Sequence, residues 1–113
     1  MIVKDEEDYL ERCLSSVKGL VDEIVLVDTG STDKTVEIAK KFTDKVFFFK
    51  WNDNYSDARN FSLSKATQEW ILVLDADEII SKNDFNKIKI LTNNKQYSGF
   101  AFERPYPDLQ DFP

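Results

Sequence analysis

The sequence contains no histidine and only one cysteine, Cys13. Because histidine is the commonest general base in enzymes, its absence removes that chemistry and excludes a Ser-His-Asp triad. A single cysteine cannot form a disulfide within the chain, and without histidine it cannot build a structural zinc site either. A protein without internal disulfides fits the reducing cytoplasm, which is where we expect this one to act.

Basic residues are in the minority, since 15 Lys and Arg stand against 21 Asp and Glu and give a net charge of −6. A nucleic-acid-binding protein needs a basic face, so we expect no nucleic acid partner. An acidic protein can still bind an anionic ligand when a metal ion bridges the two. No segment approaches the roughly 18 apolar residues that a membrane span needs, and the first residues do not resemble a signal peptide.

Glycine and proline are scarce, with three residues of each among 113. All three prolines stand at positions 105, 107 and 113, which predicts an irregular tail over 105–113. Residues 1–104 have the size of one domain, and a hydrophobic content of 42% is enough for one core. The first predicted strand starts at Met1 and the chain stops soon after the last one, so we expect a part of a longer protein.

Short apolar segments alternate with helical patterns along residues 1–104. The predicted strands are 1–3, 24–27, 46–49, 70–74 and 100–102. The predicted helices cover 6–20 with Asp5 as cap, a segment that includes Val36–Phe42, and two later segments capped by Ser56 and Ser81. Strands and helices that alternate at this spacing form parallel βαβ units. We therefore predict an α/β fold with a mainly parallel sheet.

Polar residues follow each of the first four predicted strands. Because ligands bind outside the carboxyl ends of the strands of an open parallel sheet, these residues are expected to line one site. They are Lys4, Asp5 and Glu6 after the first strand, Asp28–Asp33 after the second, Trp51–Asp57 with Arg59 after the third, and Asp75, Asp77 and Glu78 after the fourth.

Asp75 and Asp77 form the sharpest pair, because a run of five apolar residues delivers two carboxylates one residue apart. Alternation along a strand places both on the same face. Two carboxylates, with room for water and phosphate oxygens, suit Mg²⁺ or Mn²⁺. The alternative is that these acids end a strand and face solvent in a turn.

Asp28 and Arg59 each allow two interpretations. Asp28 is either a turn acid that caps the next helix or an acceptor for a nucleobase N–H or a ribose hydroxyl. Arg59 is either a surface residue paired with Asp57 or a cation aimed at a base carbonyl or a phosphate; its place at a helix start opposes the helix dipole.

The remaining polar and aromatic residues favour structural roles. Residues 30–35 lack the second glycine of a P-loop, so Ser31, Thr32 and Asp33 are better explained as helix caps. Trp51 and Tyr55 either stack on a ligand or pack at the rim. The side chains of Cys13 and Phe47–Phe49 are expected in the core.

Taken together, these segments resemble those of the family 2 glycosyltransferases, which have the GT-A fold. The matching segments are Met1–Glu7, Val25–Thr35, Trp51–Asn60 and Trp70–Glu78, in the family's order. The resemblance covers about residues 1–80 and implies a three-layer, Rossmann-like nucleotide-binding half, with 1–104 as the donor-binding domain. It is closest to a bacterial branch whose members build cell-surface glycans or modify peptides.

The resemblance also implies roles for single residues. Val3 would lie against the nucleobase through its backbone, and Asp28 would bind the uracil or equivalent base. Arg59 would lie near that base. Asp75 would contact the ribose and the metal region, and Asp77 would hold Mn²⁺ or Mg²⁺ on the diphosphate.

By the same resemblance, a sugar passes from a nucleotide-linked donor, here expected to be UDP-linked, to a glycan, lipid or peptide acceptor with inversion. The catalytic base of the family is an acid in the acceptor-binding half, well beyond the D-x-D pair. Only 35 residues follow Glu78, and none of them resembles that half, so the catalytic residue is unknown and the chain is expected to hold mainly the donor side. The expected location is the cytoplasm, including the inner face of the membrane, and an unpaired fifth strand would favour a homo-oligomer.

Two other functions remain open at this point. The chain could bind a nucleotide without transferring a sugar. A phosphatase of the haloacid dehalogenase type also has a D-x-D pair after an apolar strand. That family carries the pair on its first strand with Gly-Thr behind it, whereas here it follows the fourth and precedes Glu78 and Ile79.

Overall fold

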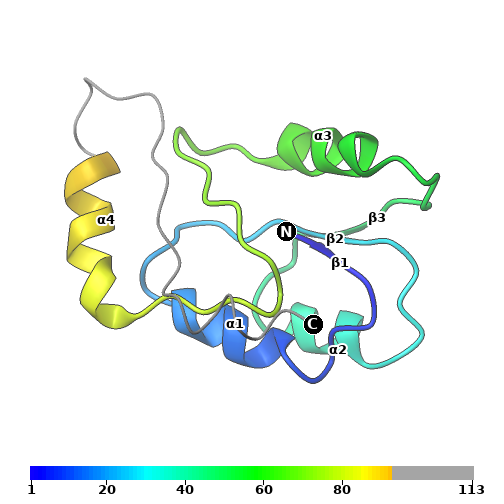
Figure 1. Ribbon diagram of the computed structural model, residues 1–113, viewed down its shortest axis with the longest axis horizontal. Coiled ribbons are helices and arrows are strands. Elements are labelled where there is room, and N and C mark those ends of the chain that lie inside the picture. The colour runs from blue at the N-terminus through cyan, green and yellow to red at the C-terminus, as the bar shows by residue number, and fades with distance from the viewer. Residues whose placement is uncertain (93–113) are drawn as a thin grey trace, which may run out of the picture.

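A parallel sheet of three short strands forms the centre of the computed structural model, which describes residues 1–92 (Figure 1). The strands are β1 (Ile2–Val3), β2 (Leu26–Asp28) and β3 (Val46–Phe48), in the order β1-β2-β3. Val3 pairs with Asp28, and Asp28 pairs with Phe48. The three strands therefore end level, and the loops that follow them start from one edge of the sheet.

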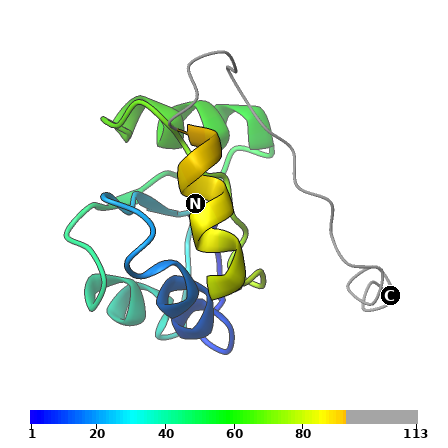
Figure 2. The same ribbon diagram turned by 90° about the vertical axis from the view of Figure 1, so that its left-hand side faces the viewer.

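Helices cover both faces of this sheet. The helices α1 (Leu10–Val17) and α2 (Thr35–Lys40) lie on one face, and α3 (Tyr55–Lys65) lies on the other (Figure 1). The short 3-10 helix η1 (Lys82–Asp84) leads into α4 (Phe85–Thr92), which stands beside these layers on the side away from the strand ends (Figure 2). The predicted α/β fold with three layers and parallel strands is confirmed.

The helix α1 packs through one apolar face, as its spacing predicts. Leu10, Cys13, Leu14 and Val17 are all buried, and they recur every three or four residues. Leu10 and Leu14 join Val3 and Leu26 in one core cluster, while Cys13 and Val17 pack with Leu74 in a second. The expectation that Cys13 lies in the core is confirmed.

The same helix is shorter than the predicted range of 6–20, and Asp5 does not cap it. Asp5 lies at a left-handed φ of 52°, and its carboxylate accepts a hydrogen bond from the backbone N–H of Thr32 at 2.8 Å. Residues 5–7 are therefore tied to the segment that follows β2, and the helix begins only at Leu10.

The predicted strand over 70–74 is wrong for the described residues, because this segment joins no ladder there. The segment keeps the alternation of a strand: Leu74 is 8% exposed, whereas Ile71 and Val73 are about half exposed. Leu72 and Leu74 pack with Met1, next to β1, in one hydrophobic cluster. The apolar pattern thus places one face of the segment on the core, although the segment forms no ladder over residues 1–92.

Three other boundaries differ from the sequence-based expectation. The ladder of β2 covers 26–28 and not 24–27; the carbonyl of Ile24 instead accepts from the Thr43 hydroxyl at 2.7 Å. The N-cap of α3 is Asn54 and not Ser56, because the Asn54 side chain accepts from the N–H of Asp57. Phe48 lies on the edge strand and is 65% exposed, while Phe47 and Phe49 are half-buried against Phe61 and belong to neither core cluster, so the expectation of a core run is wrong.

The cap at Ser81 is confirmed, since its hydroxyl accepts from the N–H of Asn83 at 3.3 Å, although a 3-10 turn precedes α4. The predicted strand over 100–102, the boundary at 104 and the tail over 105–113 lie outside the described residues. Over residues 1–92, every helix is too short or too polar to cross a bilayer.

Candidate functional site

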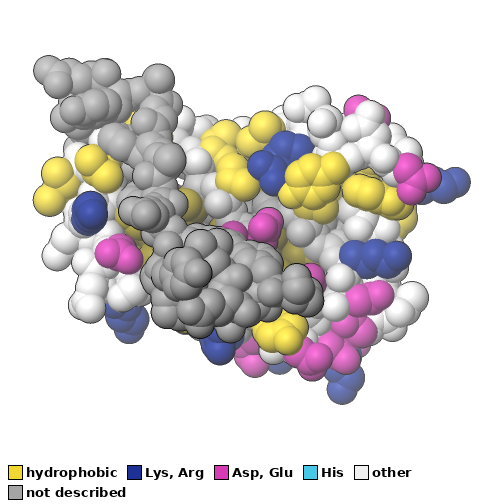
Figure 3. All heavy atoms as spheres, viewed as in Figure 1, with side chains coloured by type: hydrophobic (Ala, Val, Ile, Leu, Met, Phe, Trp, Pro, Cys, Tyr) yellow, Lys and Arg dark blue, Asp and Glu magenta, His cyan; other side chains and the backbone are white. Residues whose placement is uncertain are grey.

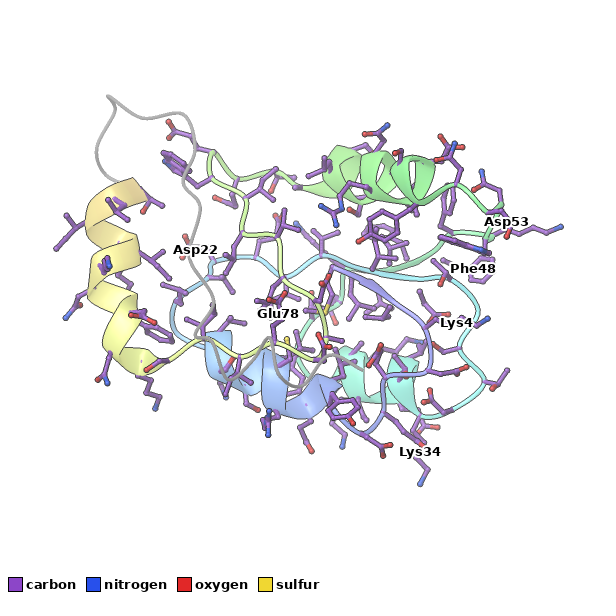
Figure 4. The ribbon with its side chains drawn as sticks, viewed as in Figure 1. Lys4, Asp22, Lys34, Phe48, Asp53 and Glu78 are labelled. Carbon is purple, nitrogen blue, oxygen red and sulfur yellow. The ribbon has the colours of Figure 1, made fainter. Side chains whose placement is uncertain are left out.

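The loops after β1, β2 and β3 meet at the carboxyl edge of the sheet. Figure 4 labels one residue in each of them, Lys4, Lys34 and Asp53, on the right-hand side, whereas Asp22 lies at the opposite edge. Figure 3 shows Asp and Glu side chains gathered over the loops that follow β1 and β2. This is the edge at which open parallel sheets bind ligands, so the strand-end residues are brought together as predicted.

Asp75 and Asp77 lie in a turn that presents both side chains to solvent. Both are exposed, while Ala76 between them is 4% exposed and belongs to the core. The turn closes on Glu78, whose N–H donates to the carbonyl of Asp75 at 3.0 Å and whose Oε1 accepts from the N–H of Asp75 at 2.8 Å. The alternation inferred from the sequence holds here, even though the strand before it does not form.

Negative charge accumulates beside this turn. The pKa of Glu6 is raised above its usual value of 4.5, first by burial and then by the carboxylates of Asp77, Asp33, Asp75 and Asp5. These acids come from the loops after β1 and β2 and from the D-x-D pair. A divalent cation would relieve this repulsion, since it is the strongest local counter-charge available to such a site.

The donor set for a metal is small. Among residues 1–92, no three acidic or cysteine side chains stand close enough to hold a metal ion by themselves. Magnesium usually keeps several water ligands and takes one or two carboxylates together with substrate phosphates. Asp75 and Asp77 fit that pattern, with a diphosphate supplying the remaining oxygens.

Asp28 is buried and serves the turn that follows β2. Its Oδ2 accepts from the N–H groups of Gly30 and Ser31, both at 3.1 Å. Gly30 has a φ of 124°, a conformation that side chains rarely adopt. These contacts support the interpretation of Asp28 as an acid that orders a turn, although it caps a loop and not α2.

Val3 is buried at the end of β1, next to Asp28. Its carbonyl accepts two hydrogen bonds from Thr29, from the N–H at 3.0 Å and from the hydroxyl at 3.1 Å. The backbone of Val3 is thus fixed against β2 at the level where the strand ends. Thr29 was not singled out from the sequence, because a threonine after a strand gives no signal of its partner.

Arg59 lies on α3, which packs against β1 and β2. Its guanidinium donates to the Tyr55 hydroxyl at 2.6 Å and lies 5.1 Å from the centre of the same ring. Asp57 accepts from Asn52 at 2.9 Å, so the interpretation of Arg59 as a surface residue paired with Asp57 finds no support in these contacts. Trp51 donates to Asp53 at 3.1 Å and is 42% exposed, as a rim residue would be.

Reciprocal hydrogen bonds join the loops after β1 and β2, and sequence reasoning missed them. The Asp5 carboxylate accepts from Thr32 while the Asp5 N–H donates to the Ser31 hydroxyl, both at 2.8 Å. Further bonds run between Glu7 and residues 33 and 34, and from the N–H of Glu6 to Thr35. Ser31, Thr32 and Asp33 were expected to cap a helix. Asp33 does accept from the N–H of Thr35, the first residue of α2, at 2.9 Å, whereas Ser31 and Thr32 bond to the neighbouring loop. The only signal was that both loops are rich in short polar side chains.

Two residues of α1 also contact the segment 75–80. The Cys13 thiol donates to the carbonyl of Asp75 at 3.4 Å, and the N–H of Ile80 donates to the Ser16 hydroxyl at 3.0 Å. Burial, together with the charges of Glu78 and Asp77, raises the pKa of the Cys13 thiol to about 12. The thiol therefore stays protonated and can donate at neutral pH.

A hollow of about 710 Å³ lies at the opposite edge of the sheet, and its lining includes Asp22, Glu23 and Lys45. It is far from the strand ends. Glu23 and Lys45 are already paired at 2.7 Å, so these charges do not converge on a ligand. The strand-end loops, and not this hollow, are the candidate site.

Two known proteins are similar to this chain in sequence. A protein of Synechococcus elongatus described as TPR repeat-containing is 53% identical over 78 residues, which are 69% of this chain and 19% of that protein. The SPbeta prophage-derived glycosyltransferase SunS of Bacillus subtilis is 42% identical over 90 residues, 78% of this chain and 21% of SunS. The chain thus spans about a fifth of the length of these two relatives.

A solved structure shows the same fold. The crystal structure of residues 1–349 of TarS from S. aureus matches with a TM-score of 0.71 at 23% identity, over 91% of this chain and 36% of that chain. The likeness shows that the chain has a GT-A, Rossmann-like fold. The family model described as "Glycosyl transferase family 2" matches residues 1–111. The chain therefore belongs to glycosyl transferase family 2.

Proposed function

We propose that this chain binds the nucleotide-sugar donor of an inverting glycosyltransferase, with UDP as the nucleotide and Mg²⁺ or Mn²⁺ between protein and diphosphate. The observation that carries the proposal is the pair of exposed carboxylates, Asp75 and Asp77, at the edge where three level strands end. Membership of family 2 supports the sugar-transfer chemistry. The phosphatase alternative loses its basis, because a family 2 domain accounts for the D-x-D pair.

Each site residue has a proposed part. Asp77 and Asp75 hold the cation, and Asp75 also contacts the ribose. Asp28 accepts from the base with the acceptor capacity that its turn contacts leave, while the fixed backbone of Val3 forms the wall against which the base lies. Arg59, held by Tyr55, faces the base from α3.

The chemistry follows from charge. A nucleoside diphosphate leaves poorly until its negative charge is neutralised. When bound, the divalent ion acts as a Lewis acid on the leaving phosphate. The carboxylates of this chain orient the diphosphate so that an acceptor hydroxyl can attack the anomeric carbon from the opposite face. An acid outside this chain would remove the proton from that hydroxyl.

The acceptor is the less defined partner. We propose a glycan, lipid or peptide acceptor on the cytoplasmic side of the cell, with a bacterial cell-surface glycan as the leading candidate product. An acceptor-binding half and a homo-oligomer are part of the same proposal, in which the described residues form the donor side of the site.

Calorimetric titration with UDP tests the proposal. In Mn²⁺, Asp77→Asn is expected to weaken UDP binding by about tenfold or more, because one ligand of the cation is lost. The fold should survive, since the side chain is exposed. Asp22→Asn is the matched control: it removes an equal charge at the opposite edge and should leave the affinity unchanged (Figure 4). Equal UDP affinity for Asp77→Asn and the unmodified chain would remove Asp77 as a ligand.

A further inference from the structure

The D-x-D turn, residues 75–80, has little regular structure of its own. One backbone hydrogen bond closes it, from the N–H of Glu78 to the carbonyl of Asp75. The turn follows a segment that forms no ladder with β1, so the sheet does not fix its orientation. Metal binding by two carboxylates needs their directions to be set before the ligand arrives. The Glu78 carboxylate also accepts from the N–H of Asp75, and contacts from outside the turn add to this order.

The helix α1 holds both ends of this turn. Cys13 is fully buried and donates to the carbonyl of Asp75, 62 residues away in the sequence, at 3.4 Å. Ser16 accepts from the N–H of Ile80, 64 residues away, at 3.0 Å. Because Cys13 and Ser16 are three residues apart on one helix, they face the turn together. The two contacts bracket the D-x-D pair, one on each side.

The carbonyl of Asp75 and the hydroxyl of Ser16 each make two hydrogen bonds. The carbonyl of Asp75 has two lone pairs, and it accepts from Glu78 and from Cys13. Ser16 donates its one hydroxyl proton to the carbonyl of Cys13 at 2.6 Å, which leaves its oxygen turned to accept from Ile80. The backbone at both ends of the turn is therefore fixed, while the carboxylates of Asp75 and Asp77 stay exposed.

We propose that Cys13 and Ser16 are positioning residues, which hold the D-x-D turn in the conformation that binds the metal and the diphosphate. The inference rests on the proposed function, in which Asp75 and Asp77 are the ligands. Neither Cys13 nor Ser16 touches the donor. Groups that hydrogen-bond to metal-binding residues without touching the metal typically contribute tenfold or more to metal affinity, and an effect of the same size is expected here.

The test compares Ser16→Ala and Ser16→Thr in the whole chain. Ser16→Ala removes the acceptor of the Ile80 N–H, whereas Ser16→Thr keeps a hydroxyl at the same place. Ser15→Ala is the matched control, because Ser15 is exposed on the same helix. Two quantities are measured: the exchange rates of the amides of residues 78–80 without ligand, and the affinity for UDP with Mn²⁺ and with EDTA.

For Ser16→Ala we expect faster exchange at residues 78–80 and about tenfold weaker UDP binding in Mn²⁺, with the affinity in EDTA changed less than about twofold. Ser16→Thr and Ser15→Ala should match the unmodified chain. Cys13→Ser, which retains a donor, should bind UDP in Mn²⁺ more tightly than Cys13→Ala, which has none. If Cys13→Ala fails to fold, the partly buried Ser16 still decides the question.

Three outcomes would overturn the inference. Unchanged exchange rates and affinity in Ser16→Ala would show that α1 does not order the turn. An equal loss of affinity in Mn²⁺ and in EDTA, unrescued by Ser16→Thr, would indicate a general structural defect. If the unmodified chain gains nothing from Mn²⁺, the proposed function fails together with the positioning role, whereas unchanged exchange alone leaves the proposed function standing.

Discussion

Asp28 is a buried carboxylate that orders the turn after β2 and, in the proposed function, also binds the nucleobase. Its Oδ2 accepts from the N–H groups of Gly30 and Ser31, and Oδ1 lies 3.3 Å from the N–H of Ser31. A carboxylate offers about four lone-pair sites. The turn therefore does not exhaust the acceptor capacity of Asp28, and the rest is available at the strand ends.

Asp28→Asn separates the two roles. An asparagine keeps one oxygen for the turn but puts an NH₂ group where the second oxygen was. We expect UDP binding to weaken by about tenfold, in line with the roughly 1.5–3 kcal/mol of a hydrogen bond to a charged group. Binding of inorganic pyrophosphate should change by less than about twofold, because Asp28 is assigned to the nucleoside end. Calorimetry with both ligands measures this.

Asp28→Ala completes that comparison. It leaves two partly buried N–H groups without their acceptor and should lower the free energy of unfolding by about 1–3 kcal/mol. An equal loss of affinity for UDP and pyrophosphate in Asp28→Asn would assign the carboxylate to the metal or to the structure alone.

At the scale of elements, side-chain contacts join segments that the hydrogen bonds of the sheet do not connect. Glu23 precedes β2, and its carboxylate is held by Lys45, just before β3, at 2.7 Å. It also accepts from the N–H of Thr67 at 3.0 Å and from the Thr67 hydroxyl, beyond the end of α3. One side chain therefore ties the starts of two strands to the chain that follows a helix.

The pH dependence of stability should reveal this contact. The hydrogen bonds from Lys45 and Thr67 lower the pKa of Glu23 from 4.5 to about 2 in the folded chain. A folded pKa below the unfolded one gives stability that is present above about pH 4.5 and is lost as the pH falls toward 2. In denaturant titrations, Glu23→Gln should therefore be less stable than the unmodified chain at neutral pH, and the difference should shrink below pH 4.5.

Glu37→Gln, at an exposed position of α2, is the control for this measurement and should not alter the pH profile relative to the unmodified chain. The prediction is contradicted if the difference in free energy of unfolding between Glu23→Gln and the unmodified chain stays constant down to about pH 2. Glu23 would then have the same pKa in the folded and the unfolded chain.

The hydrophobic periodicity of the sequence predicted which helices and strands form better than it predicted where each begins and ends. The apolar face of α1 and the three strands follow from spacing, because burial of side chains imposes it. The boundaries depend on partners far away in the sequence, as the contacts of Asp5 with Ser31 and Thr32 show. The segment 70–74 has the pattern of a strand and packs its apolar face on the core, yet it joins no ladder over residues 1–92. No local pattern carries that information.

The same limit applies to the candidate site. The acids and Arg59 could be placed at one edge from the sequence, because parallel strands end together. The contacts between α1 and the D-x-D turn could not be predicted. Cys13 was expected only as a core residue, and nothing in the sequence indicated that its thiol faces Asp75. Core positions reveal their burial through spacing but not their polar partners.

At the scale of the whole molecule, three layers bring acidic loops to one edge of a chain with a net charge of −6. In the proposed function the donor is anionic, and a cation between donor and protein offsets the repulsion at this edge. In the same proposal, Asp75 and Asp77 hold that cation, and Cys13 and Ser16 order their turn. The chain also covers about a fifth of the length of the two relatives described above.

We therefore predict donor binding without sustained transfer for this chain alone. Incubation with a panel of UDP- and GDP-sugars, Mn²⁺ and simple acceptors should give binding and at most slow hydrolysis of the donor. Chromatography of the products distinguishes hydrolysis from transfer. Sustained turnover onto an acceptor would show that the catalytic base lies within these 113 residues, with Asp84, Glu103, Asp108 and Asp111 as the acids to substitute.

The most direct test of the account is the position of a bound Mn²⁺–UDP complex. Mn²⁺ is paramagnetic and broadens the NMR signals of nearby amides, so a titration of isotope-labelled chain maps the metal. We predict broadening at residues 75–78 and at the loops after β1 and β2, with the signals of residues 22–24 and 43–45 unaffected, and loss of the effect in Asp77→Asn. Broadening centred on residues 22–24 and 43–45, or none in the presence of UDP, would contradict a metal-dependent donor site at the strand ends.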